Sequence, residues 1–295
     1  MHRFRLTATA LLLCSAVLTL NAQKQLALIA TVSPASGSDT SITARDVSVT
    51  ENGAALGVSK VELLPRLPKL LILIDNGSGL PASALGELRN SVKAFLREMP
   101  PGLETTLITT APQGRTLQAP TTDRERLLMA VDRIAPDAGT GAFVESVRDA
   151  MERIDKDKDE SAAYAVVNVA TTSGNLRFRE NDVKMISEMA ARRHPVVYTV
   201  LLNVISAASL GGAQIEIGKG LAEMTGGRFE TIGLTNRLTT LLPEIGATVA
   251  KLLGNGTHQL RVMVERSTSG PLGQVRIDIP GLQVMQLTLD AARTK

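Results

Sequence analysis

Hydrophobic periodicity divides the chain into three parts. Residues 26–64 contain an apolar run at 26–32, an alternating run at 47–50 and a further run at 56–63, separated by turn residues, and this pattern predicts β-strands. Asn52-Gly53 separates two of these runs and favours a tight hairpin, because both central residues of such a turn need a positive φ. After residue 256 the alternation returns at 259–264, 274–279 and 284–289, which again predicts strands.

The middle of the chain alternates between strand and helix patterns. Its first strand is an unbroken apolar run, residues 70–74, which is typical of a central strand buried on both faces. Further strands are expected at 105–110, 115–119, 165–170, 195–202 and 228–232, and helices near 85–99, 123–134, 143–154, 183–190, 217–224 and 238–252. Strands joined by helices predict an α/β fold with a doubly wound, mainly parallel sheet and small β additions at both ends. The expected domains are an N-terminal β-hairpin region at 23–64, the α/β domain at 65–256 and a C-terminal β region at 257–295.

The N-terminal segment has the features of a signal peptide. Arg3 and Arg5 precede an apolar stretch at 6–20, which is too short for a comfortable membrane span. We expect cleavage after residue 22, so that the protein is exported to the periplasm or secreted. Cys14, the only cysteine, lies within this segment, and Leu13 before it disfavours a lipid anchor. We expect no transmembrane helix once the segment is removed.

Charge and aromatic content argue against nucleic acid as a partner. Removing residues 1–22 lowers the number of Lys and Arg residues from 32 to 30 against 29 Asp and Glu, so the net charge falls to about +1. Aromatic residues are 2% of the chain and tryptophan is absent, which leaves few platforms for stacking bases. Because cysteine is absent after residue 22, the 44% hydrophobic content must supply a core without disulfides.

Five stretches of the chain carry recognisable motifs. They are Asp46-Val-Ser-Val-Thr-Glu-Asn-Gly53, Leu71-Ile-Leu-Ile-Asp-Asn-Gly-Ser-Gly79, Asp137-Ala-Gly-Thr-Gly-Ala-Phe-Val-Glu-Ser-Val147, residues 166–175, and Leu221-Ala-Glu-Met-Thr-Gly-Gly-Arg-Phe229. In their order and spacing, which cover nearly the whole chain after residue 22, they resemble a von Willebrand factor A (vWA) domain, and more narrowly the exported bacterial VWFA-related proteins. The resemblance implies a doubly wound sheet with an ion-assisted protein-binding site beyond the carboxyl ends of its strands.

The resemblance also places a metal site on this chain. Asp75, Thr140 and Ser173 stand at its metal-ligand positions, but Gly77 and Gly79 replace two hydroxyl residues. Ser173 stands where a second carboxylate is expected. Mg²⁺ prefers a near-octahedral set of oxygens, so these replacements predict a decayed site and no resident cofactor. A bound Mg²⁺ or other divalent ion remains the alternative.

The same residues admit another interpretation without a metal. Asp75 would accept hydrogen bonds from loop amides, the glycines would permit a tight loop, and Thr140 would cap a helix beginning near Gly141. The surface around Asp75 would then bind a protein partner directly. The residues expected on this ligand face are Asn76, Ser78, Thr140 and Asn175.

Three functional hypotheses follow. The first is an exported, non-catalytic interaction or adhesion module with a decayed metal site, whose partner is a protein of the cell envelope or beyond it. The second is a vWA domain that binds its ligand through a divalent ion. The third is an exported serine hydrolase using Ser78, which would need His194 or His258 nearby; the predicted topology places His194 at the opposite end of the sheet. The alternating acids at 155–159 resemble the start of a calcium loop but lack its later ligands.

Overall fold

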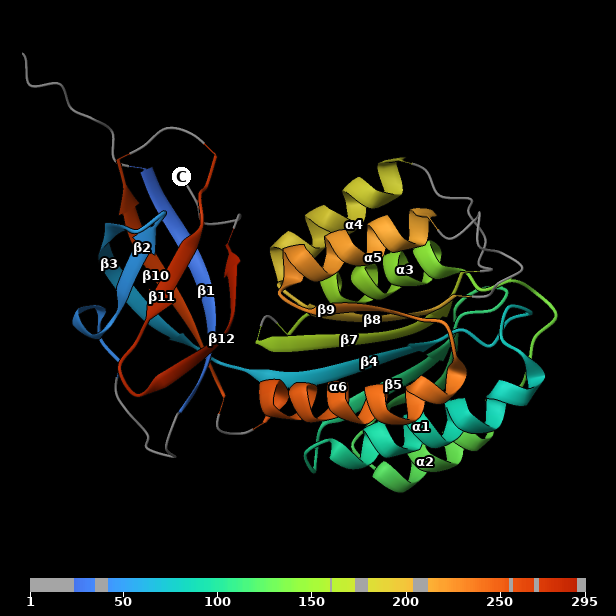
Figure 1. Cartoon of the computed structure of the whole chain (residues 1–295). Coiled ribbons are helices and arrows are strands. Elements are labelled where there is room, and N and C mark those ends of the chain that lie inside the picture. The colour runs from blue at the N-terminus through green and yellow to red at the C-terminus, as the bar shows by residue number, and fades with distance from the viewer. Residues whose placement is uncertain are drawn as a thin grey trace, which may run out of the picture.

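The computed structural model describes residues 24–34, 42–159, 161–172, 180–203, 212–254, 257–267 and 271–290. Two six-stranded sheets organise these residues, one parallel except at its edge and one antiparallel. Figure 1 shows them side by side, the antiparallel sheet in a β domain and the parallel sheet between two layers of helices. In these described residues, none of the helices combines the length and apolarity that a bilayer crossing requires.

The α/β domain has the strand order β6-β5-β4-β7-β8-β9. Each strand from β5 to β9 pairs with its neighbours in parallel, except β6, which pairs with β5 in antiparallel fashion. The strands are β4 (Leu67–Ile74), β5 (Glu104–Thr109), β6 (Arg115–Thr121), β7 (Ala162–Thr171), β8 (Val196–Leu202) and β9 (Arg228–Ile232). This arrangement confirms the expected doubly wound, mainly parallel sheet.

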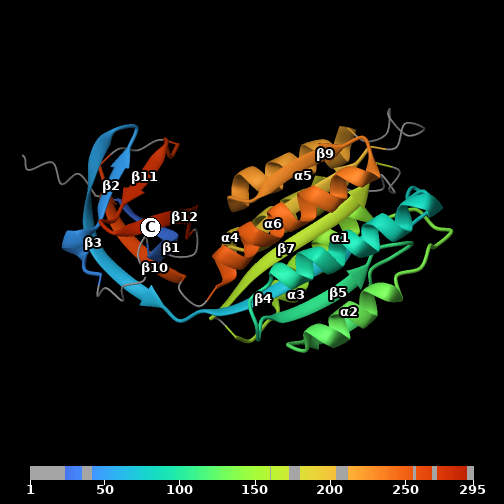
Figure 2. The same ribbon diagram turned by 60° about the horizontal axis from the view of Figure 1, so that its bottom comes forward.

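Helices cover both faces of this sheet. They are α1 (Leu85–Glu98), α2 (Arg124–Asp132), α3 (Phe143–Asp155), α4 (Glu180–Arg193), α5 (Gly212–Thr225) and α6 (Leu238–Leu253). Figure 2, which turns the molecule by 60°, shows α1, α2 and α6 on one face, while Figure 1 shows α3, α4 and α5 on the other. Alternate residues of β4 serve the two cores: Leu70, Ile72 and Ile74 face the first group, and Leu71 and Leu73 the second. Burial on both faces explains the unbroken apolar run.

The β domain is built from both ends of the described chain. Its strand order is β11-β2-β3-β10-β1-β12. The strands are β1 (Lys24–Pro34), β2 (Ser48–Glu51), β3 (Ala54–Leu64), β10 (His258–Arg266), β11 (Val275–Asp278) and β12 (Leu282–Leu289). Strand β1 lies between β10 and β12, with Leu26 opposite Val264 and Leu28 opposite Leu289. The two β additions therefore form one sheet, and the α/β domain is inserted between β3 and β10.

Local sequence signals locate several element boundaries. Asn52 and Gly53 adopt φ values of 50° and 84° at the β2–β3 turn, as the hairpin prediction requires. The carboxylate of Asp123 accepts hydrogen bonds from the amides of Glu125 and Arg126 and begins α2. Gly226, with φ of 69°, ends α5 in the left-handed conformation. The hairpin prediction is confirmed, and the other two residues lie at the ends of helices that the periodicity predicts near 123–134 and 217–224.

Candidate functional site

The candidate site lies where β4, β5 and β7 end. Asp75 directly follows β4, and its amide donates to the carbonyl of Val169 in β7 at 2.8 Å. The amide of Thr110 donates to the carbonyl of Ile74 at 3.0 Å. Because parallel strands end at the same edge of the sheet, these bonds bring the loops after the three strands together.

The carboxylate of Asp75 is buried and engaged by the protein itself. Its residue is only 4% exposed. Oδ1 accepts a hydrogen bond from the amide of Gly77 at 2.8 Å. Oδ2 accepts from the amide and the hydroxyl of Thr171, at 3.1 and 2.6 Å. The expected bond from a loop amide is confirmed, and hydrogen bonds of this kind stabilise a buried carboxylate.

Thr171 is the residue of this site that the sequence interpretation missed. It is the last residue of β7 and reaches across to the neighbouring strand β4. The only sequence signal is its position, a hydroxyl residue at the end of an apolar strand adjacent to the one that carries Asp75. Finding the contact requires the register of β4 against β7, which places Ile74 opposite Val169.

Glycines allow the loops to close over Asp75. A Cβ atom on Gly141 would lie 2.2 Å from Oδ2 of Asp75, and one on Gly77 would lie 2.6 Å from the carbonyl oxygen of Gly139. The amide of Ser78 donates to the same Gly139 carbonyl at 2.8 Å. Close approach of the two loops therefore requires glycine at 77 and 141, as the interpretation of a tight loop supposes for position 77.

The expected ligand-face residues divide into two kinds. Asn76 is buried, and its side chain bridges two loops: Nδ2 donates to the carbonyl of Ala135 at 2.8 Å, and Oδ1 accepts from the amide of Ala111 at 3.2 Å. Asn76 thus faces inward, against the expectation. Ser78 and Thr140 are exposed on adjacent loops. Ser173 and Asn175 lie outside the described residues.

Thr140 does not cap a helix. Helix α3 begins at Phe143, as the periodicity predicts, and not near Gly141, as the capping interpretation requires; its N-cap residue is Ala142, which has no side chain able to accept a hydrogen bond. The amide of Ala142 instead donates to the carbonyl of Thr110 at 3.0 Å. The capping prediction is wrong because the loop stays extended far enough to pack Gly141 against Asp75.

The oxygen atoms available as metal ligands at this edge do not fit a tightly bound divalent ion. Asp75 is the buried carboxylate of these loops, and both of its oxygens already accept hydrogen bonds. Asp137, the other carboxylate there, accepts a hydrogen bond from the amide of Gly139 at 2.9 Å through Oδ1. Glycines occupy positions 77 and 79, where the resemblance has hydroxyls. A Mg²⁺ ion needs a near-octahedral oxygen set at short distances. Across the described residues, His, Cys, Asp and Glu form no group of three or more suited to hold a metal.

The acidic run after α3 serves the opposite end of the sheet. Asp157 accepts hydrogen bonds from Nζ of Lys69 at 2.7 Å and from the hydroxyl of Tyr164 at 2.5 Å. Burial opposes ionisation of Asp157, but these bonds outweigh it and lower its pKa to about 2. Asp155 pairs with Arg192, and Asp159 with the hydroxyl of Ser161. All three acids are engaged by protein groups, which explains their spacing without calcium.

The two described histidines lie away from Ser78. His194 lies two residues before β8 at the amino end of the sheet, whereas Ser78 follows β4 at the carboxyl end. His258 begins β10 in the β domain, opposite Val32 of β1. The position of His194 matches the expected topology.

Solved structures similar to this chain show its fold. A von Willebrand factor type A protein from Catenulispora acidiphila is 12% identical, with a TM-score of 0.53, and the match covers 90% of this chain and 73% of that one. Proximal thread matrix protein 1 from the mussel byssus is 12% identical, with a TM-score of 0.50, covering 65% of this chain and 49% of that one. The chain thus spans about half the length of the mussel protein. Its α/β domain has the vWA fold.

Comparisons of the sequence with protein families and with curated proteins find no match. The chain matches no protein-family model. It also matches no curated protein. The match to the Catenulispora protein covers more of the chain than residues 65–256, so it extends into the β domain.

Proposed function

We propose that this protein is an exported, non-catalytic interaction module of the VWFA-related type, which binds a protein partner at the carboxyl end of its α/β sheet without a bound metal ion. The observation that carries the proposal is the closed state of Asp75. Both oxygens of its carboxylate accept hydrogen bonds from Gly77 and Thr171, and the backbone of Gly141 packs against it. A carboxylate held in this way serves the architecture of the loops. The fold is compatible with many functions, so the argument rests on the site.

The exposed groups at this edge can contact a partner directly. Ser78 and Thr140 project from two loops that the Ser78–Gly139 hydrogen bond joins, so their positions are coupled. Hydroxyl groups and small residues give a surface with hydrogen-bonding capacity and little steric obstruction. A partner would therefore pack closely on the loops and pair with their hydroxyls and backbone.

The geometry also supports a role without catalysis. A serine nucleophile needs a base within hydrogen-bond reach. His194 lies at the opposite end of the parallel sheet from Ser78, and His258 lies in the β domain. A fluorophosphonate probe for serine hydrolases should leave the protein unlabelled; labelling that disappears in Ser78→Ala would overturn this part of the proposal.

The metal question has a direct test. Isothermal titration of the protein with Mg²⁺, Mn²⁺ and Ca²⁺ should show no saturable binding in the micromolar range. Saturable binding that is lost in Asp75→Asn and retained in Asp157→Asn would contradict the proposal and favour an ion-dependent vWA domain. The second variant is the matched control, because Asp157 lies at the other end of the sheet.

The partner can be sought by capture from the cell envelope of the source organism. The chain from residue 23 onward is immobilised beside a double variant, Ser78→Arg with Thr140→Arg, which places two large cations on the proposed face. A specific partner should bind the first and not the second, and EDTA should leave its binding unchanged. Equal capture by both would show that the binding face lies elsewhere.

A further inference from the structure

The β domain meets the base of the α/β domain along a polar seam. Strand β12 contributes to this contact through Gln286 and Thr288. Nε2 of Gln286 donates to the carbonyl of Thr225 at the end of α5 (2.5 Å), while Oε1 of Gln286 accepts from the hydroxyl of Thr31 (3.3 Å). A Cβ atom on Gly226 would lie 3.0 Å from Cγ of Gln286, so the backbone after α5 packs closely against the side chain of Gln286.

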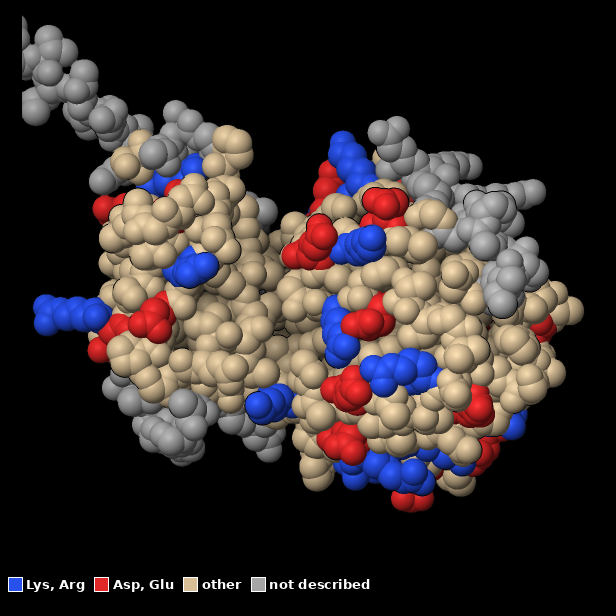
Figure 3. Space-filling view, viewed as in Figure 1, with Lys and Arg blue, Asp and Glu red and all other residues tan. Residues whose placement is uncertain are grey.

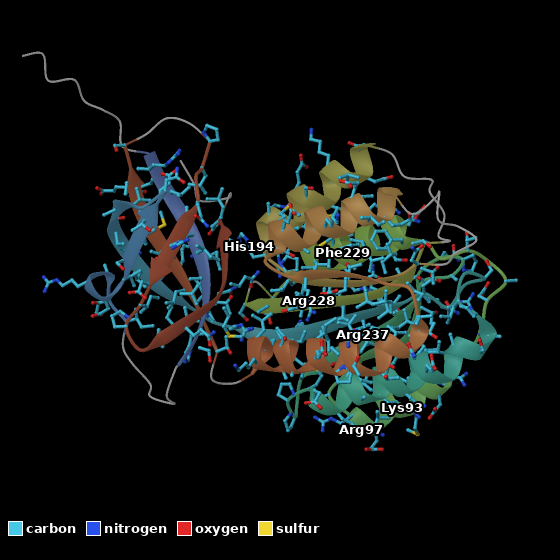
Figure 4. The ribbon with its side chains drawn as sticks, in the orientation of Figure 1. Lys93, Arg97, His194, Arg228, Phe229 and Arg237 are labelled. Carbon is cyan, nitrogen blue, oxygen red and sulfur yellow. The ribbon has the colours of Figure 1, made fainter. Side chains whose placement is uncertain are left out.

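His194 occupies the same seam. Its amide donates to the carbonyl of Ala190 at 2.8 Å and so ends α4, and its φ of 49° turns the chain toward β8. Nδ1 of its ring lies 3.4 Å from the hydroxyl oxygen of Thr288 in β12. Figure 4 shows the residue between the two domains. His194 therefore contacts the β domain while it belongs to the α/β domain.

Two clefts flank this histidine. One, of about 390 Å³, lies between the domains and includes Ile29 and Gln259 from the β domain in its lining. The other, of about 210 Å³, includes Met224 and Leu289. His194 lines both, so water that enters either cleft can reach its ring if the seam opens.

The charged groups that face His194 come from several elements. Arg193 precedes it at the end of α4, Arg261 projects from β10, and Asp290 follows β12. Asp155 and Arg192 line the cleft as a bidentate pair. Burial lowers the pKa of His194, Asp290 opposes this, and Arg261 and Arg193 lower the pKa further. Asp290 also pairs with Arg261 at 2.9 Å, which weakens the compensation it can give to a histidinium.

The connections between the domains allow the seam to open. The chain crosses once through Pro65 and Arg66 and returns between α6 and β10. The guanidinium of Arg66 donates to the carbonyls of Leu252 and Thr257, so both crossings lie together on one side. Two adjacent crossings define a hinge, and contacts made by β12 and His194 then determine the angle between the domains.

We propose that His194 is a pH-sensitive latch: as a neutral imidazole it allows β12 to dock against the base of the α/β domain, and as a cation in acid it weakens this docking. The hydroxyl of Thr288 can donate or accept, so this contact is available to either form of the ring. Docking favours the neutral ring because a cationic ring would lose part of its hydration and would lie beside two arginines. Docking is fully favourable above the ordinary pKa of 6.5 and weakens as the pH falls through the lower docked value.

The angle between the two domains can be followed with a spin label on each domain. Cys14 is the only cysteine, so Cys14→Ser gives a clean background for Ala55→Cys in β3 and Lys219→Cys in α5, both of which are exposed. Double electron–electron resonance should give a narrow distance distribution near pH 7.5 and a broader or longer one near pH 5. Between the docked and free pKa values the docking constant should fall up to about tenfold per pH unit.

Matched variants distinguish a latch from general acid sensitivity. His194→Asn introduces a residue that tolerates the left-handed backbone, and its distance distribution should stay narrow at both pH values. His258→Asn removes the other described histidine, and its distance distribution should broaden near pH 5 as that of the parent does. His194→Lys carries a permanent charge, so its distance distribution should already be broad near pH 7.5. The proposal fails if the parent is unchanged near pH 5, if His194→Asn broadens equally, or if circular dichroism shows that the broadening is unfolding.

Discussion

The two ends of the parallel sheet use their polar residues in different ways. At the carboxyl end, one buried carboxylate is enclosed by small residues and fully engaged by neighbouring loops. At the amino end, Lys69 pairs with Asp157 and Glu104, Tyr164 donates to the same aspartate, and the β domain docks nearby. Figure 3 shows that, on one face of the α/β domain, acidic and basic residues are interspersed.

This difference shows how the loops at the carboxyl end close over Asp75. The hydroxyls expected at positions 77 and 79 are replaced by glycines, and Thr171 from the adjacent strand supplies a hydroxyl to Asp75 instead. The loops then approach until Gly141 contacts the carboxylate. Burial of the charge is stabilised because each of its oxygens has a donor. The loops at the carboxyl end are therefore closed around Asp75, while the polar groups at the amino end are partly buried and lie near a second domain.

Of the substitutions considered at the carboxyl end, one at Gly141 should disrupt the packing of the closed loops most. Gly141→Ala places a methyl group 2.2 Å from Oδ2 of a short, buried, hydrogen-bonded side chain. We expect the free energy of unfolding to fall by about 3 kcal/mol, at the upper end for overpacking. Urea denaturation followed by circular dichroism measures it. Gly220→Ala in α5 is the control, since its Cβ meets nothing within 4 Å and the change should be neutral or stabilising.

A second variant tests the hydrogen bonds alone. Asp75→Asn keeps the shape of the side chain but turns one acceptor into a donor facing Gly77 or Thr171. We expect a loss of about 2 kcal/mol, because a buried donor then opposes another donor. If the variant is as stable as the parent, the carboxylate is not held by these bonds. Thr171→Val should lose less, since the backbone amide of Thr171 still reaches Asp75.

The sequence predicts the local parts of this structure well. The turn at Asn52-Gly53, the cap at Asp123 and the buried strand β4 depend on residues a few positions apart, and the structure contains all three. The sheet class follows from the alternation of strands and helices. These features need no knowledge of which distant segments meet.

The remaining features depend on contacts between distant segments. The union of the two β regions rests on the pairing of β1 with β10 and β12, of β3 with β10 and of β2 with β11, and periodicity specifies no partner for a strand. The Asp75–Thr171 bond requires the register of two strands far apart in the sequence. Thr140 fails as a cap because tertiary packing of the loop, rather than local propensity, decides where α3 begins.

A substitution at the amino end of the sheet is expected to reduce stability less, and by an amount that depends on pH. Asp157→Asn removes the charge that Lys69 and Tyr164 meet, and we expect a loss of about 1 kcal/mol near neutral pH because this pair is partly solvated. The folded-state pKa is about 2, below the ordinary 3.8, so the parent's advantage should be present above pH 3.8 and disappear as the pH falls toward 2. Denaturation of both proteins across this range measures the difference; an advantage that persists at pH 2 would contradict the assignment.

The smallest effect on stability is expected at the exposed residues of the carboxyl end. Ser78→Ala and Thr140→Ala remove hydroxyls that project into solvent, so each should change the free energy of unfolding by less than about 0.5 kcal/mol. If this face binds a partner, both variants should nevertheless weaken capture of that partner. Asn76→Ala provides the contrast, since its side chain is buried and bridges two loops; it should reduce stability before it affects binding. A large loss of stability in Ser78→Ala would show that this hydroxyl belongs to the closed architecture and not to the binding face.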